Sequence, residues 1–79
     1  MNKLRQDISI GNNLRTLRKK RKLTQDQVAA KLQLMGSKTT RSVYSRYETG
    51  ELNILISDLM ELTKIFDCTF NDFFSGLDE

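Results

Sequence analysis

A short segment of this chain, residues 24–35, carries both a start signal and a stop signal for an α-helix. Thr24 and Gln27 form a capping-box pattern, in which each side chain bonds the backbone N–H of the other residue. Apolar side chains then repeat at helical spacing as far as Met35, and Gly36 follows where helices often end in a left-handed residue. The pattern predicts a helix ending at about Met35, with an inward face formed by Val28, Ala29 and Leu32.

A second segment with its own signals follows almost at once. Thr39 or Thr40 can cap a helix that runs to Thr49, and Gly50 supplies the next stop signal. Residues 36–39 then form a four-residue turn, which is the usual length between the two helices of a helix-turn-helix. Two short helices joined this closely favour a compact all-α fold.

The segment before this pair is also predicted to be helical. Ile10, Leu14 and Leu17 share one face of a helix over about residues 10–21. Residues 1–9 show no such period, and they form either an N-terminal arm or an early start of the same helix.

A fourth helix is predicted over about residues 54–66. Asn53 and Ser57 are both candidates for its N-cap. Its buried face is expected to hold Leu55, Leu59, Leu62 and Phe66.

A short fifth helix is predicted over residues 70–74, because Thr69 with Asp72 three residues later resembles another helix start. Its inward residues are expected to be Phe70, Phe73 and Leu77. Cys68 is expected to fill the core, as a free cysteine usually does. Residues 76–79 are left as a C-terminal tail, and residues 10–75 form the single domain.

Composition excludes several classes of protein. The chain has 79 residues, one cysteine, no histidine and no proline, which suits one small helical domain without disulfides or a Cys/His metal site. Nothing supplies a nucleophile and a base together, so neither an enzyme nor a cofactor is expected. The longest apolar run, residues 54–56, is far too short for a membrane span, and a cytoplasmic protein is expected.

Charge is divided sharply along the chain. Residues 15–46 hold ten basic residues and one acidic residue, whereas residues 47–79 hold one basic residue and eight acidic ones. This asymmetry favours a polyanion as the partner of the basic part. The alternative for the run RKKRK at 18–22 is a solvated helix end, where cations suit the negative C-terminal dipole.

A specific family resemblance is carried by the segments NNLRTLRKKRKLTQDQVAAKL, RSVYSRYETG and LMELTKIFDCTFNDFF. Together they resemble the lambda repressor/Cro-like helix-turn-helix family of the xenobiotic-response-element type, over about residues 10–74. The resemblance implies a compact five-helix DNA-binding domain of bacterial or phage origin. Counted back from Glu48, this chain has about five residues more than the family pattern between helices two and three, so a lengthened helix two and connection are expected.

The resemblance implies that the outward residues of the third helix reach the major groove of DNA. The corresponding residues here are Thr40, Arg41, Ser42, Ser45 and Arg46. Arginine can bond guanine through two donors, and serine or threonine can serve several bases, so the two arginines are the expected base readers. The alternative left open is that both arginines touch only phosphates.

Phosphate contacts are expected from Gln25, Lys38 and Thr39. Gln25 matches a family glutamine at the start of helix two, where the amide and the helix N-terminus can hold a phosphate. The alternative for Gln25 is ordinary polarity at a helix start. Lys38 is expected to compensate for Glu51, which occupies a loop position that is usually basic in the family.

The resemblance also implies a structural ion pair between Arg18 and Glu48, which would tie the first helix to the third. The alternative is that Arg18 is only one of five basic residues in a row. Tyr44 occupies a position that usually holds a smaller aliphatic residue. Its hydroxyl must therefore find a partner or point outward.

The function that this resemblance implies is sequence-specific binding of double-stranded DNA by a transcriptional regulator, with a repressor favoured. An antitoxin or adaptor that binds a protein partner through the same fold is the alternative. A palindromic operator and a homodimer formed through the C-terminal half are expected. The candidate dimer residues are Leu52, Ile54, Ile56 and Phe74, unless most of them fill the core. The protein would be nucleoid-associated when bound.

Overall fold

The computed structural model describes residues 3–76 of the chain, with side chains described from residue 10 onward. This part of the chain folds into four α-helices and one short 3-10 helix, so the predicted all-α fold is confirmed. The elements are α1 (Lys3–Lys20), α2 (Gln25–Leu34), α3 (Arg41–Thr49), α4 (Ile56–Phe66) and η1 (Phe70–Phe74).

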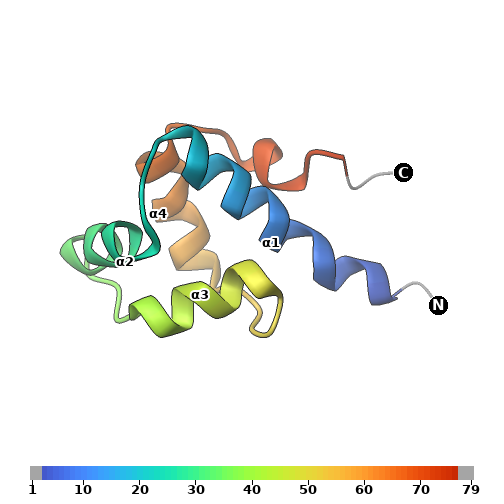
Figure 1. Cartoon of the computed structure of the whole chain (residues 1–79), viewed down its shortest axis with the longest axis horizontal. Coiled ribbons are helices and arrows are strands. Elements are labelled where there is room, and N and C mark those ends of the chain that lie inside the picture. Colours follow the sequence, from blue (N-terminus) through green and yellow to red (C-terminus); the bar gives the residue numbers. More distant parts are fainter. Residues whose placement is uncertain (1–2, 77–79) are drawn as a thin grey trace.

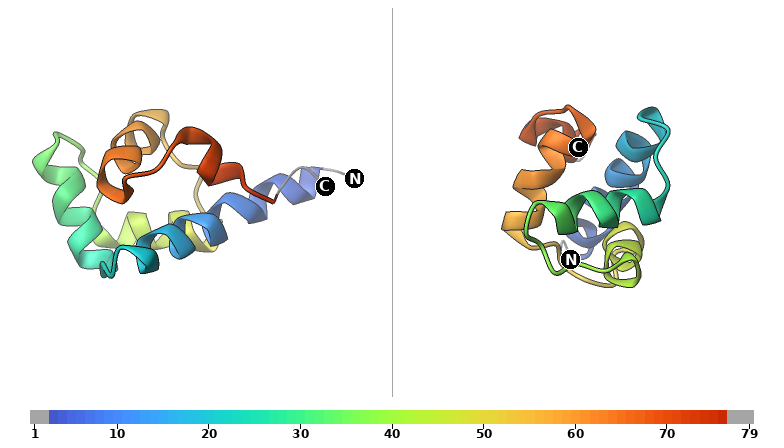
Figure 2. Two further views of the ribbon diagram at one scale, coloured as in Figure 1. Left: turned by 90° about the horizontal axis from the view of Figure 1, so that it is seen from above. Right: turned by 90° about the vertical axis from the view of Figure 1, so that its left-hand side faces the viewer.

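Each of the five elements packs against at least two others (Figure 1). α3 contacts both α1 and α2, while α4 contacts α2 and η1, and η1 returns to contact α1. The N-terminal turns of α1 extend beyond the other helices, which is clearest when the molecule is viewed from above (Figure 2, left).

α1 begins at Lys3, well before the predicted start at residue 10. Residues 3–9 therefore continue the helix, as one of the two sequence-based alternatives proposed, and they do not form a separate arm. Lysine, leucine, arginine and glutamine, which dominate this stretch, are good helix formers even without a hydrophobic period. Residues 1–2 of the predicted arm lie outside the described residues.

α2 starts and ends as its signals predict. The Thr24 backbone N–H donates to Gln27 Oε1 at 2.8 Å, and the Gln27 N–H donates to Thr24 Oγ1 at 3.1 Å. At the other end, Gly36 is left-handed with φ 99°, and the Ser37 N–H donates to the Leu32 carbonyl at 3.0 Å. These bonds satisfy backbone groups that a helix end leaves unpaired.

The predicted inward position of Met35 is wrong. α2 ends at Leu34 with Met35 as its C-cap, so the predicted end is correct within one residue. Because the turn begins there, the Met35 side chain is 41% exposed and the Leu34 side chain is 87% exposed. Leu34 and Met35 therefore complete the end of α2 without enlarging the core.

The connection between α2 and α3 spans residues 35–40, counting both caps. Thr40 is the N-cap of α3, because its hydroxyl accepts from the Val43 N–H at 3.2 Å. Thr39, the other candidate cap, is buried instead. The residues between the two caps are 36–39, which is the four-residue turn predicted, and the residues at 37 and 39 are used for tertiary contacts.

α4 begins two residues later than predicted, and neither Asn53 nor Ser57 caps it. Its N-cap is Leu55, whose side chain makes no capping bond. Ile54 packs against the core instead of entering the helix. Leu55 is consequently 58% exposed rather than buried, whereas the other three predicted inward residues are buried: Leu59, Leu62 and Phe66.

η1 occupies the predicted residues 70–74 but as a 3-10 helix. Thr69 is its N-cap, as the sequence indicated, and the Thr69 N–H donates to Asp72 Oδ2 at 2.9 Å. Phe73 is fully buried, whereas Phe70 is 43% exposed at the rim of the core, where its ring packs edge-on against Phe73 with 6.1 Å between centroids. Leu77 and the rest of the predicted tail beyond Gly76 lie outside the described residues.

One apolar core joins all five elements. Cys68 is half-buried and packs against it, as expected, together with Ile10, Leu17 and Ile54. Full burial of each large side chain contributes about 1.5–3 kcal/mol relative to exposure. The buried members of the core are Leu14, Val28, Leu32, Tyr44, Tyr47, Leu59, Leu62, Phe66 and Phe73.

Gly11 marks the closest approach between α1 and α3. A Cβ atom at this position would lie 2.3 Å from the Glu48 carbonyl oxygen, which belongs to the backbone and cannot turn aside. We therefore expect Gly11→Ala to lower the free energy of unfolding by about 1–3 kcal/mol, despite the better helix propensity of alanine. Urea denaturation measures the change. Asn12→Ala, at the exposed neighbouring position, is the control and should stay within about 0.5 kcal/mol.

Candidate nucleic-acid interface

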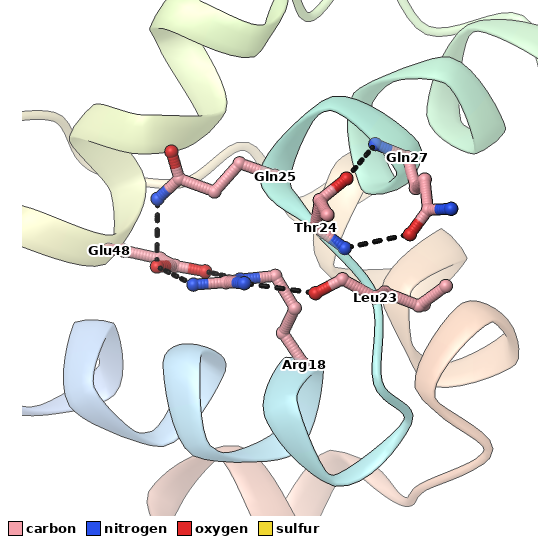
Figure 3. A network of polar contacts seen from close by, with 6 residues as sticks. All are labelled: Arg18, Leu23, Thr24, Gln25, Gln27 and Glu48. Carbon is pink, nitrogen blue, oxygen red and sulfur yellow. Dashed lines mark hydrogen bonds and ion pairs between the residues drawn. The ribbon is translucent and has the colours of Figure 1, made fainter.

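A buried ion pair joins the end of α1 to the end of α3 (Figure 3). Arg18 Nε donates to Glu48 Oε2 at 2.7 Å, and Arg18 Nη2 donates to Glu48 Oε1 at 3.1 Å. The exposed fractions of the two side chains are 11% and 4%. This is the pair that the family resemblance implied, in the two-pronged geometry that makes arginine–carboxylate contacts strong and directional.

Two further segments are attached to the same pair. Arg18 Nη1 donates to the Leu23 carbonyl at 2.9 Å, which fixes the turn leading into α2. Gln25 Nε2 donates to Glu48 Oε1 at 3.0 Å, which fixes the first residue of α2. The pair therefore sets the positions of α1, α2 and α3 relative to one another.

The surroundings keep Glu48 charged. Burial alone would raise the pKa of Glu48, but hydrogen bonds from Arg18 and Gln25 and the nearby positive charge outweigh it, so the pKa lies below its usual value. The same contact acts in the opposite direction on its partner, because the hydrogen bonds to Glu48 raise the pKa of Arg18. Both side chains are thus ionised at neutral pH.

Tyr44 lies beside this pair with its ring fully buried. Its hydroxyl is buried and makes no hydrogen bond with the described residues, so it neither finds a partner nor points outward. Burial, with the Glu48 carboxylate nearby, raises the pKa of Tyr44. The ring packs edge-on against Tyr47, one turn further along α3, with 6.2 Å between centroids.

The opposite face of α3 carries the predicted base readers. Arg41, Ser42 and Arg46 are exposed, and Ser45 is half-buried. Thr40 is exposed as well, although its hydroxyl already caps the helix. Arg41, Ser42, Ser45 and Arg46 thus lie on the side of α3 that faces away from the buried Tyr44 and Tyr47, and Thr40 lies at the N-terminal end of the helix.

Each of the two arginines of this face lies near a carboxylate. Arg41 Nε is 3.4 Å from Asp26 Oδ1, and Arg46 Nε is 3.9 Å from Glu51 Oε1. All four side chains are more than half exposed. Ion pairs of this kind contribute little to stability, so the arginines are available for exchange with another anion.

The three predicted phosphate contacts differ in accessibility. Lys38 is exposed on the connection, and Gln25 is half-buried at the start of α2, with one amide N–H bonded to Glu48. Thr39 is 5% exposed, and its hydroxyl donates to Asp58. Because that donor is used inside the protein, the expectation of a phosphate contact from the Thr39 side chain is not supported by this geometry.

Sequence reasoning missed Asp58, a carboxylate that is only 2% exposed. It accepts hydrogen bonds from Ser37, Thr39 and Tyr47. A signal existed, because residue 58 precedes Leu62 by four and therefore lies on the buried stripe of α4. An acid on a buried stripe requires hydrogen-bond donors nearby, and the hydroxyl residues of the connection supply them.

A shallow polar hollow lies beside the Arg18–Glu48 pair. It is lined by Asn12 and Arg15 of α1 and by Gln25 and Thr49, and Arg15 was not singled out from the sequence. Within the described residues, no group of three or more metal-binding side chains occurs. Among the described helices, none combines the length and the apolar character that crossing a bilayer requires.

A family model for helix-turn-helix proteins matches residues 14–73 of the chain. The chain therefore belongs to the Cro/C1-type helix-turn-helix family, which is XRE-like. Its class is that of a DNA-binding helix-turn-helix regulator. Comparison with curated proteins and with solved structures gave no match.

Replacing Glu48 tests the importance of the buried pair. We expect Glu48→Gln to lower the free energy of unfolding at neutral pH by about 2–3 kcal/mol, because it leaves the Arg18 charge without its counterion. Glu61→Gln, in the exposed pair with Lys64, is the matched control and should cost less than about 0.5 kcal/mol.

The loss of stability caused by Glu48→Gln should depend on pH, because the pKa of Glu48 is lowered in the folded protein. A carboxylate with a lowered folded-state pKa stabilises the protein fully above its unfolded value, and this contribution is lost as the pH falls through the folded-state value. The difference in unfolding free energy between the wild type and Glu48→Gln should therefore shrink as the pH falls below the usual glutamate pKa of about 4.3. Denaturation series at several pH values measure it, and a constant difference down to acid unfolding would contradict the assignment.

Proposed function

We propose that this chain is a sequence-specific regulator of transcription that binds double-stranded DNA by inserting α3 into the major groove. The observation that carries the proposal is the exposed face of α3, where Arg41 and Arg46 stand with hydroxyl side chains on a helix fixed from behind by the Arg18–Glu48 pair. A rigid helix with exposed donors is the usual reader of base edges.

The charge distribution supports the same orientation. The ten basic residues of segment 15–46 belong to α1, α2, α3 and their connections. Most of the acids of segment 47–79 follow α3 in the chain, in α4, η1 and the segments beside them. A polyanion is attracted to the first part and repelled by the second. This field favours approach with α3 toward DNA.

The division of labour on the DNA follows from the donors available. Arg41 and Arg46 are proposed to read bases, with Thr40, Ser42 and Ser45 adding contacts. Their ion pairs with Asp26 and Glu51 are exposed, and binding would exchange them for contacts with DNA. Lys38 and Gln25 are proposed to contact phosphates.

Repression is the simplest way in which such a domain can act. Occupying an operator blocks access to the DNA and requires no surface other than the DNA-binding face. We therefore propose a repressor, and we propose that it reads a palindromic operator as a homodimer.

An exposed apolar surface at the far end of α3 is the proposed dimer interface. A groove there is lined by Ile10, Tyr47, Leu59 and the residues that follow Gly50, and its rim is exposed. The surface contains few charges and no lysine or arginine among its lining residues, so DNA is a poor occupant. A second copy covers the same apolar residues on both partners: Leu52, Ile56 and Phe74.

The same apolar surface favours a second candidate function, that of an antitoxin or adaptor whose main partner is a protein. Apolar patches of this kind mark protein interaction sites in general. The two candidates differ in DNA binding, because an interaction module does not need a duplex.

The first test is selection of bound duplexes from a random pool, followed by a salt titration. We expect enrichment of a palindrome and an affinity that falls steeply with salt, because bound cations release counterions from the DNA. Absence of binding to any duplex at low salt would favour the interaction module.

Substitution of the α3 arginines tests the proposed readout. Arg46→Ala and Arg41→Ala should each lower affinity for one half-site of the selected duplex by roughly 5- to 150-fold and should relax the preference at one base position of that half-site. Lys64→Ala, on the acidic part of the chain, is the control. An equal loss for all sequences would mean that the arginines touch only phosphates.

Substitution of Ile56, which is 64% exposed, tests the dimer. Ile56→Glu should leave the melting temperature within a few degrees of wild type, because the side chain fills no core position. Sedimentation should show monomer at concentrations at which the wild type is dimeric, and affinity for a palindrome should fall while affinity for one half-site is retained. A wild type that stays monomeric on DNA would refute this interface.

A further inference from the structure

A second buried polar cluster, separate from the Arg18–Glu48 pair, surrounds Asp58. We propose that Asp58 is a positioning residue for DNA binding, which holds the connection 35–40 in one conformation so that Lys38 is presented to a phosphate. This inference rests on the proposed function, because it assigns a role within the same DNA-binding surface.

The geometry of the cluster is well defined. Ser37 Oγ donates to Asp58 Oδ1 at 2.7 Å, while the Thr39 hydroxyl and the Tyr47 hydroxyl both donate to Oδ2, the latter at 2.8 Å. Asp58 is 2% exposed, so these bonds are formed in a region that excludes water. One carboxylate of α4 therefore attaches both the connection and α3.

The backbone of the connection is fixed by the same residues. The Thr39 N–H donates to Ser37 Oγ at 3.0 Å, and the Thr39 carbonyl accepts from Gln33 Nε2 at 2.9 Å. Residues 37 and 39 are thus held on both sides of Lys38, whose own side chain is exposed. Hydrogen bonds therefore fix the conformation of the connection on both sides of Lys38.

Stability alone is a weak reason for this arrangement. A buried carboxylate loses its hydration, and none of the described lysine or arginine side chains forms an ion pair with Asp58 to offset that loss. The three hydroxyl groups can all donate to the Asp58 carboxylate in only one arrangement of the chain. The cluster therefore favours a single conformation of the connection. A connection fixed before binding avoids the loss of conformational entropy that a mobile loop would suffer on the DNA.

The chain offers a matched set of variants. Ser37→Ala and Thr39→Val each remove a hydroxyl that attaches the connection to Asp58. Tyr47→Phe removes a hydrogen bond to the same carboxylate but leaves the connection attached, and its ring keeps its place in the core. Affinity is measured for one half-site of the duplex selected from a random pool, so that one copy of the chain binds and dimerisation does not contribute. It is measured at several salt concentrations and well below the melting temperature of every variant.

The expected result separates positioning from stability. Ser37→Ala and Thr39→Val should lower affinity about five- to tenfold. Each should also reduce the slope of log affinity against log salt by about 0.9, the value for one lost phosphate contact. Tyr47→Phe should lower the melting temperature about as much as the two connection variants do, because it also removes one hydrogen bond to Asp58. It should leave the affinity and the salt slope unchanged. In a Lys38→Ala background, neither connection variant should reduce the slope further, because the contact is already absent.

Other outcomes would overturn the inference. If Tyr47→Phe changes binding as much as the connection variants, or if none of the three changes it, the cluster serves stability alone. If Thr39→Val acts and Ser37→Ala does not, Thr39 contacts the DNA directly. If the wild type binds no duplex at all, the proposed function itself fails, and that result is distinct from the other two.

Discussion

The arrangement of this domain depends on one buried ion pair. Arg18 and Glu48 are 30 positions apart in the sequence, and their two-pronged contact fixes the end of α1 against the end of α3. The same two side chains bond the Leu23 carbonyl and the Gln25 amide, so the start of α2 is fixed as well. Removing water from two charges is costly, and only a complete set of partners makes such a pair tolerable, which is why four segments converge there.

A second polar cluster, around Asp58, fixes the connection between α2 and α3. Residues 35–40 lead from the end of α2 at Leu34 to the start of α3 at Arg41. Asp58 fixes this connection through Ser37 and Thr39, and through Tyr47 it holds α3 on the same side chain. The two clusters thus secure the last turn of α3 and the connection that leads into its first turn, while Arg41 and Arg46 remain exposed.

Much of the fold could be predicted from the sequence because its signals are local. The Thr24–Gln27 capping box, Gly36 and Gly50 act through bonds within a few residues, and the helices they delimit were predicted within one residue. The start of α4 was predicted too early, because Ile54 packs on the core instead of joining the helix. Phe70 and Met35 were wrongly expected to be buried. Hydrophobic periodicity shows which residues share a face of a helix, but it does not show where the surface that packs against this face ends.

The candidate site divides in the same way. The sequence by itself determined that the chain would form short capped helices, that its basic residues would gather on the first three of them, and that a helix-turn-helix would result. Only the tertiary structure decided that Thr39 turns inward and that Asp58 receives it, because these residues lie 19 positions apart and meet only after α4 has packed on α2. Burial of a polar group depends on donors supplied from elsewhere in the chain, and no local pattern specifies them.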